Sequence, residues 1–208
     1  MSTADYIRRL KDLKEGERSR LRSLAGRPLD ARLDGFDLFT GLWWPLRHDS
    51  PAAPRRETSW LVAKLFGAFG SAVPHVVPEG ETIGPPLPAV LGVCEPGDPP
   101  EFKSRDRFRA RFDALLCTPL PALEPHLRLA LGEIARAKQG RVPHARGVSG
   151  IDWAVLLDDL SLWDRTYNPN DTHQKSRINA HMNAVGCGEE HASPQDLWAC
   201  AYLRAADR

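Results

Sequence analysis

Apolar residues recur every three or four positions near the start of the chain. They cover about one third of a helical wheel and are Ile7, Leu10, Leu13, Leu21 and Leu24. This spacing predicts an amphipathic segment, which Gly16 is expected to divide into two helices. Residues 34–46 then predict a short apolar helix that ends at Pro45. Residues 57–70 are apolar on nearly all sides and therefore predict a buried helix.

The second half of the chain has the same helical periodicity. Its proline-rich start, residues 71–102, predicts a long surface connection with one short helix at 87–93. Ser104 is expected to cap the next helix. The apolar positions of that helix are Phe108, Phe112, Leu115 and Leu116. Further helices are predicted at about 120–139, 150–163 and 194–206.

Acidic and apolar residues are mixed in residues 150–163, GIDWAVLLDDLSLW. The apolar stripe is Trp153, Leu156, Leu157, Leu160 and Trp163. Asp158 and Asp159 are adjacent, so they point about 100° apart on a helix and cannot converge on one catalytic or metal site. We expect both on a solvated or salt-bridged face beside the apolar stripe. Asp152 and Ser149 are expected at a capping-box-like start of the helix.

The pattern as a whole predicts an all-α fold, because no segment alternates with the period of a strand. We expect a single domain over residues 1–208, built as a compact bundle of about eight or nine helices. The domain can divide into an N-terminal lobe of about 1–100 and a C-terminal lobe of about 101–208. A chain of 208 residues with 42% hydrophobic content is long enough to bury such a core.

Several classes of protein have no support in the sequence. No apolar run reaches the ~18 residues of a membrane span, so no membrane partner is expected. The four cysteines form no CxxC pair, and without a signal peptide we expect free thiols in the cytoplasm. Nucleotide-binding, GxSxG and HExxH motifs are absent, so we expect neither an enzyme with catalytic residues nor a cofactor.

Residues 168–193 bring three histidines and a cysteine close together in sequence. They are His173, His181, Cys187 and His191, and their spacing matches no zinc pattern. We therefore expect a surface insertion without metal. A structural zinc site is the alternative.

Positive charge is concentrated in two segments. Residues 8–27 hold eight Lys or Arg against three acidic residues, and residues 103–146 hold ten against four. Such an asymmetry favours an anionic partner. In the first segment the candidate residues are Arg18, Arg20, Arg22 and Arg27.

Four arginines of the second segment form two rows with helical spacing. Arg105 and Arg109 make one row, Arg107 and Arg111 make the other, and the two rows flank the Phe108 stripe. Guanidinium groups placed in this way suit a phosphate backbone. Base-stacking aromatic residues are not interleaved with them, which favours a protein that binds the backbone without reading sequence. Charge clustering adds Lys138, Arg141 and Arg146.

Six motifs follow one another along residues 5–164. They are LKEGERSRLRSLAG, FTGLWWPLR, SWLVAKLFGAF, RFDALL, HLRLAL and IDWAVLLDDLSLW. In this order they resemble the CasB family, the small subunit of the Cascade-type CRISPR surveillance complex of type I-E. The final helix at 194–206 extends the resemblance, whereas residues 168–193 have no counterpart in it and form an unmatched insertion.

The resemblance implies an all-α, non-catalytic subunit that functions in antiviral defence. Its partners would be the guide RNA, the backbone of the target and displaced DNA strands, other Cascade subunits and a second copy of itself. The family's basic positions correspond to Arg18, Arg20, Arg22, Lys103, Arg105, Arg107, Arg111 and Arg128. Guide–target pairing reads sequence in such complexes, so the protein need only supply cations.

Two other functions remain open at this point. An α-helical adaptor could use the same arginines to bind an acidic protein. A metal-binding protein could use the histidines of residues 168–193.

Overall fold

A computed structural model describes residues 2–27, 36–49, 54–97, 102–142, 145, 147–164 and 193–207. This part of the chain contains nine α-helices, one 3-10 turn and no strand, which confirms the all-α prediction. The helices are α1 (Thr3–Asp12), α2 (Glu15–Ser23), α3 (Phe36–Asp49), α4 (Arg56–Phe69), α5 (Leu87–Val93), α6 (Phe102–Leu116), α7 (Glu124–Lys138), α8 (Trp153–Leu162) and α10 (Pro194–Ala206), with the 3-10 turn η2 (Leu120–Ala122) between α6 and α7.

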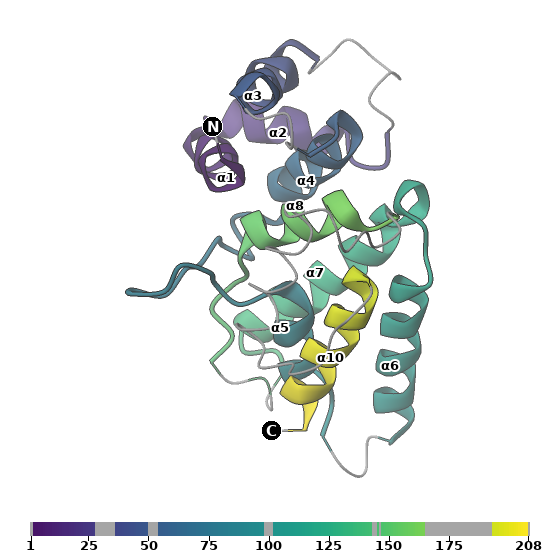
Figure 1. Cartoon of the computed structure of the whole chain (residues 1–208). Coiled ribbons are helices and arrows are strands. Elements are labelled where there is room, and N and C mark those ends of the chain that lie inside the picture. Colours follow the sequence, from purple (N-terminus) through teal and green to yellow (C-terminus); the bar gives the residue numbers. More distant parts are fainter. Residues whose placement is uncertain are drawn as a thin grey trace.

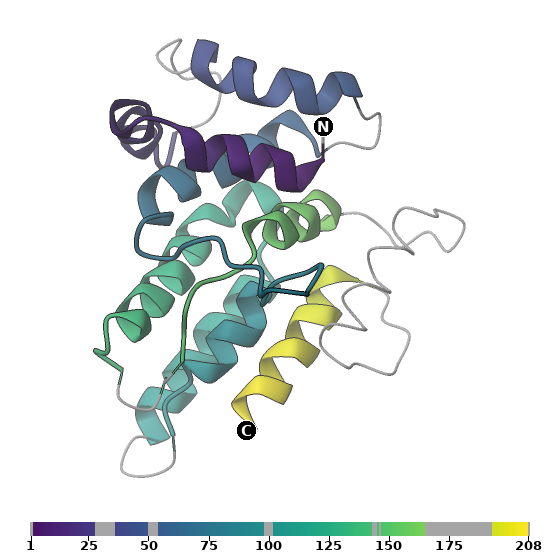
Figure 2. The same cartoon turned by 90° about the vertical axis from the view of Figure 1, so that its left-hand side faces the viewer.

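The helices form two groups with α8 between them (Figure 1). Helices α1 to α4 lie together at one end, and α5, α6, α7 and α10 lie at the other (Figure 1). The connection between α4 and α5 runs across the outside of the molecule (Figure 2). Backbone hydrogen bonds from Val76 to Ile151 and from Ile151 to Pro74 hold it against the segment that leads into α8. The division of the chain into two lobes stays a prediction.

Helix α8 is packed on several sides, which the sequence pattern did not indicate. It contacts α1 and α4 of one group and α10 of the other. Trp153, Leu157 and Leu160 are fully buried in it. The prediction that these acidic residues, Asp158 and Asp159, lie on a solvated or salt-bridged face is wrong for Asp159, which is buried, and holds only in part for Asp158, which is half-buried.

Both acidic side chains of α8 are used inside the fold. Asp159 is buried and accepts a hydrogen bond from Nε1 of Trp198 at 2.8 Å. Asp158 is half-buried and accepts one from the hydroxyl of Thr3 at 3.2 Å. Asp152 caps α8 by accepting from the amides of Ala154 and Val155. Asp158 and Asp159 therefore connect α8 to other helices, and Asp152 caps its first turn.

Several helix boundaries differ from the prediction. For example, α7 begins at Glu124, after the 3-10 turn η2, and not at about residue 120. Helices α1 and α2 separate at Leu13 and Lys14, and Gly16 lies inside α2. Helix α3 continues through Pro45 to Asp49, because the next residue, Leu46, is buried in the core and its packing offsets the lost hydrogen bond. Helix α6 begins before Ser104.

Cysteine usage also differs in part from the prediction. Cys94 is buried and Cys117 is exposed, and neither forms a disulfide. Cys200 is disulfide-bonded, so the expectation that all thiols are free is wrong. Burial raises the pKa of the Cys94 thiol to about 12, with a contribution from Glu133, which leaves that thiol protonated and unreactive.

Candidate nucleic-acid interface

The two arginine rows of α6 have different surroundings. Arg105 and Arg109 point toward Glu95, the second residue after α5. The side chain of Glu95 is only 3% exposed. Their Nε atoms lie 2.6 and 2.9 Å from Oε1 of Glu95. This row is therefore engaged in an ion-pair network inside the protein, and its contact with nucleic acid stays a prediction.

The other oxygen of Glu95 accepts a hydrogen bond from the hydroxyl of Tyr202 in α10. Burial alone would raise the pKa of Glu95, but hydrogen bonds from Arg109, Tyr202 and Arg105 outweigh burial and lower it. Glu95 is consequently a stable carboxylate that gathers α6 and α10 around the end of α5. The same carboxylate raises the pKa of the Arg109 guanidinium.

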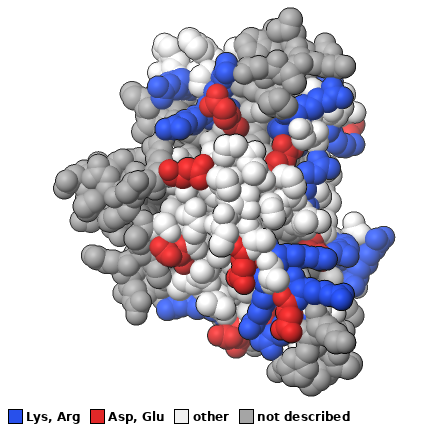
Figure 3. Space-filling view, turned by 90° about the vertical axis from the view of Figure 1, so that its right-hand side faces the viewer, with Lys and Arg blue, Asp and Glu red and all other residues white. Residues whose placement is uncertain are grey.

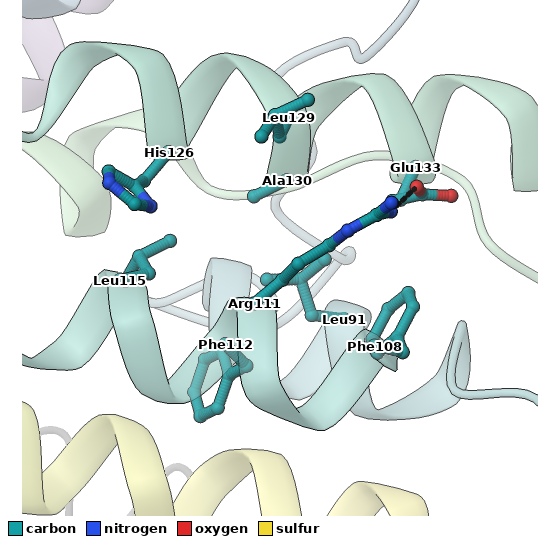
Figure 4. Close-up of a pocket in the computed structure, with 9 residues that line it drawn as sticks. All are labelled: Leu91, Phe108, Arg111, Phe112, Leu115, His126, Leu129, Ala130 and Glu133. Carbon is teal, nitrogen blue, oxygen red and sulfur yellow. Dashed lines mark hydrogen bonds and ion pairs between the residues drawn. The ribbon is translucent and has the colours of Figure 1, made fainter. Parts of the chain in front are cut away.

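The second row faces away from this network. Arg107 is exposed, and Arg111 reaches across to α7, where its NH1 lies 3.4 Å from Glu133. The close-up shows the Arg111 side chain extending from α6 over the gap toward Glu133 (Figure 4). Arg136, which the sequence analysis did not single out, is exposed and pairs with the same carboxylate. Two guanidinium groups thus share one Glu where α6 meets α7, so positive charge exceeds negative charge there.

An apolar pocket lies beneath this row, between α6 and α7 (Figure 4). Phe108, Leu115, His126 and Leu129 are among its lining residues. Leu129 is 56% exposed. The pocket therefore presents an apolar floor with cations at its edge.

Two larger hollows lie close to the pocket and are linked to it by shared lining residues. Leu129 also lines an open groove of about 900 Å³ that contains Arg128 and Phe69. Gly26 and Glu124 belong both to this groove and to a cavity of about 340 Å³ that contains Arg27. We call the three together the hollow face. It runs from Arg111 past Arg128 to Arg27, and so joins both groups of helices.

Positive side chains gather on this side of the molecule. Figure 3 looks onto the side that α6 forms, and Lys and Arg side chains cluster in its lower right part, with acidic side chains among them. Arg27, Arg107, Arg111 and Arg128 are all exposed. Exposed guanidinium groups beside an open groove are able to contact phosphates without prior rearrangement.

The arginines of α2 are placed differently. Arg18 donates from Nε to the carbonyl of Leu13 at 2.9 Å and from NH2 to that of Lys11 at 3.0 Å, so it caps the end of α1. Arg22 donates to the carbonyl of Gly67 in α4 at 3.2 Å. Arg20 is exposed. Arg18 and Arg22 therefore hold helices together, a role that charge counting could not reveal.

The last candidates lie near the ends of helices. Lys138 and Arg141 are exposed at the end of α7. Lys103 lies in the first turn of α6, but its side chain is outside the described part of the structure, as is Arg146. The histidines and Cys187 of residues 168–193 also lie outside it. Among the described residues no group of His, Cys, Asp or Glu is arranged to hold a metal ion, and no described helix could cross a bilayer.

The sequence analysis missed a buried ion pair at the hollow face. Lys64 of α4 and Glu124 of α7 lie 2.6 Å apart, and their side chains are only 4% and 14% exposed. The available signal was Lys64 itself, a charged residue in a helix that is apolar on nearly all sides.

Comparison with known proteins identifies the family of this fold. The profile of the family described as CRISPR-associated protein Cse2 matches residues 17–182. The chain belongs to the Cse2 family. The family predicted from the six sequence motifs is thereby confirmed. No curated protein matches the chain.

Solved structures agree with the Cse2 fold. A CRISPR-associated protein of the Cse2 family from Thermus thermophilus is 22% identical, with a TM-score of 0.57, over 98% of this chain and 99% of that one. A structure described as CasB, also from Thermus thermophilus, is 24% identical, with a TM-score of 0.52, over 85% of this chain and 96% of that one. At this identity the two structures establish the fold alone, and the family profile establishes the membership.

Proposed function

We propose that this Cse2-family protein is a non-catalytic small subunit of a CRISPR RNA-guided surveillance complex of the Cascade type. In that role it stabilises the guide RNA–target DNA duplex and the displaced strand in antiviral defence. The hollow face is the observation that carries this proposal, because it offers Arg27, Arg111 and Arg128 along hollows that share lining residues. Arg107 adjoins this surface one helical turn from Arg111.

Contact with the phosphate backbone fits the chemistry of the hollow face better than base reading. Its aromatic rings are buried or half-buried, among them Trp60, Phe69 and Phe108. Without an exposed ring on which bases could stack, the arginines supply most of the attraction, and arginines alone tolerate any sequence. A subunit that follows a guide-defined duplex needs this tolerance.

The buried carboxylates support a non-catalytic role. Glu95, Asp152 and Asp159 each accept hydrogen bonds that fix helices. General acid–base chemistry needs a carboxylate that can reach a substrate. We place the protein in the cytoplasm with the guide RNA, the DNA strands, the other Cascade subunits and a second copy of itself as partners.

Salt-dependent binding tests the proposal. The double variant Arg107→Ala/Arg111→Ala is compared with Arg9→Ala/Lys11→Ala, which removes two exposed charges from α1 on the opposite side of the molecule (Figure 2). Binding of a fluorescent single-stranded oligonucleotide is measured from low to moderate salt. For two lost phosphate contacts the slope of log K against log salt should fall by about 1.4, whereas the α1 control should keep the wild-type slope.

Two results would contradict the proposal. One is equal slopes for both double variants, which would mean that the hollow face is not the binding surface. The other is a wild-type protein that binds no oligonucleotide, free or within an assembled guide-RNA particle. Salt-sensitive binding to an acidic protein instead would favour the adaptor function.

A further inference from the structure

Arg27 is the last residue described after α2, and the turn that carries it is fastened from two sides. Gly26 has a φ of +76°, a conformation that glycine adopts without strain. Its amide donates to Oε1 of Glu124 at 2.5 Å. The carbonyl of Arg27 accepts from Nζ of Lys64 at 2.8 Å and from Nε1 of Trp60 at 3.3 Å. Hydrogen bonds thus hold the backbone at Gly26 and Arg27 in place, while the side chain of Arg27 is exposed.

Lys64 and Glu124 join the two groups of helices at this turn. Lys64 comes from α4 and Glu124 from the first turn of α7, and their side chains meet at 2.6 Å. Nζ of Lys64 also lies 5.7 Å from the ring centroid of Trp60. Glu124 lines both the groove that contains Arg128 and the cavity that contains Arg27. The ion pair is therefore located where the two hollows meet.

A gain in the stability of the fold does not by itself explain a buried ion pair such as Lys64–Glu124. Removing two charges from water carries a penalty that their attraction often only balances, and apolar residues of similar volume frequently replace buried pairs without loss. A buried pair can instead fix one arrangement among several, since any other arrangement leaves a charge unpaired. Here the arrangement that it fixes is the position of the Arg27 turn relative to α7.

The pair also affects the charge of the hollow face. Glu124 alone would repel a phosphate that approaches Arg27 or Arg128. Lys64 neutralises that carboxylate from within the fold. The other carboxylate that lines the cavity, Glu57, forms an ion pair with Arg56.

We propose that Lys64 and Glu124 are positioning residues that set Arg27 beside Arg128 for contact with a nucleic-acid phosphate. This inference rests on the proposed function. Neither positioning residue contacts the ligand. They act through Arg27, by holding the turn that presents it.

A double-mutant cycle on oligonucleotide binding tests this role. The apolar variant Lys64→Met/Glu124→Leu removes the ion pair and keeps side-chain volume in the cavity. Arg27→Ala removes the phosphate contact itself. Each should lower the salt slope by about 0.7, the loss of one contact to a single strand. Their combination should lower it by the same amount and no more, because the pair acts only through Arg27.

Arg107→Ala is the matched control. Combined with Lys64→Met/Glu124→Leu it should lower the slope by about 1.4, since Arg107 does not depend on the pair. A purely structural role predicts a different pattern, in which removal of the pair weakens binding equally with and without Arg27. Additive losses in the Arg27→Ala background would overturn the inference, as would an Arg27→Ala variant that binds like wild type.

The two proposals fail in distinguishable ways. If wild-type protein does not bind, or Arg107→Ala/Arg111→Ala has no effect, the proposed function fails and the inference with it. If those variants behave as expected and the cycle is additive, the inference alone fails. Should circular dichroism show that the apolar double variant is unfolded, Lys64→Met/Glu124→Gln takes its place. This variant also leaves the net charge unchanged, keeps an acceptor for Gly26 and removes the bond from Lys64 to the Arg27 carbonyl, so the same non-additive pattern with Arg27→Ala is expected.

Discussion

The hydroxyl of Tyr202 donates a hydrogen bond to the carboxylate of Glu95, which connects α10 to the end of α5. The other oxygen of that carboxylate binds Arg105 and Arg109 of α6. One buried acid therefore gathers three helices, and two of the most prominent arginines in the sequence are engaged by it. This contact is why the two arginine rows of α6 have different surroundings.

Loss of the Glu95 charge should destabilise the fold. In Glu95→Gln one acceptor oxygen remains, but the ion pairs with both guanidinium groups are lost and an NH2 group replaces the second acceptor, so the network is weakened. We expect a loss of about 2 kcal/mol in the free energy of unfolding, below the full cost of a broken buried pair because Arg109 is 39% exposed. Urea denaturation followed by circular dichroism measures it. The exposed Glu81→Gln serves as control and should stay within about 0.5 kcal/mol of wild type.

The same carboxylate predicts how stability depends on pH. Burial raises the pKa of Glu95, but the hydrogen bonds of Arg109, Tyr202 and Arg105 bring it below its usual value of 4.5. The folded state thus holds this proton less tightly than the unfolded state, so the contribution is complete above the usual pKa and is lost as pH falls through the lowered one. The stability difference between wild type and Glu95→Gln should be constant from neutral pH to about 5 and shrink in stronger acid. A difference that already shrinks between pH 7 and about 6 would assign the effect to another group.

Much of the helical fold can be predicted from periodicity. The predicted helices at 57–70, 87–93 and 194–206 agree with α4, α5 and α10 to within one residue at each end. Each has a clear start or stop signal, such as Pro194 in the first turn of α10. Other boundaries moved although the sequence carried a signal, as at Pro45, where α3 continues and the following residue, Leu46, is buried in the core.

Contacts between residues that are distant in sequence account for the buried acidic side chains that periodicity did not predict. Asp159 reads as a solvent-facing residue because it lies off the apolar stripe, yet Trp198 comes from 39 positions away to bind it. Glu95 and Tyr202 are separated by 107 positions. A local pattern describes which side of a helix is apolar, but it does not show that a second helix covers the opposite side.

The sequence predicted which arginines cluster along the chain, but it did not predict which of them lie on the same surface. Spacing correctly separated the α6 arginines into two rows, but only the partner of each row distinguishes them. Arg105 and Arg109 meet Glu95, whereas Arg111 reaches Glu133 of α7 and Arg107 is exposed. Lys64 and Glu124 carried no signal of their joint role, because the pair forms only when α4 and α7 meet.

Close approach of α5 and α10 gives a prediction about Gly92. A Cβ atom at this position would lie 2.3 Å from the carbonyl oxygen of Tyr202 and 3.0 Å from the amide nitrogen of Ala206. Both are backbone atoms, so the helices would have to separate. Gly92→Ala should therefore cost about 1–3 kcal/mol despite the better helix propensity of alanine.

Gly132 provides the matched control within a helix. A Cβ atom there would meet nothing within 4 Å. Gly132→Ala should consequently leave stability unchanged or raise it by up to about 1 kcal/mol. Thermal unfolding of the two variants measures the contrast, and equal effects would mean that α5 and α10 do not pack as closely as described.

Arg107 and Arg109 are two residues apart on α6. Alanine substitution should lower the stability of the fold at Arg109 and weaken nucleic-acid binding at Arg107. Arg109→Ala leaves the buried Glu95 with one fewer partner and should cost about 1–3 kcal/mol of stability. Arg107 is exposed, so Arg107→Ala should change stability by less than about 0.5 kcal/mol and lower the salt slope of oligonucleotide binding by about 0.7. Urea denaturation and binding titration on the same protein preparations measure both effects. Both substitutions remove the same charge from the same helix. A difference between them therefore reports where each guanidinium is used, and a shared loss of binding with unchanged stability would mean that Glu95 releases Arg109 to the nucleic acid.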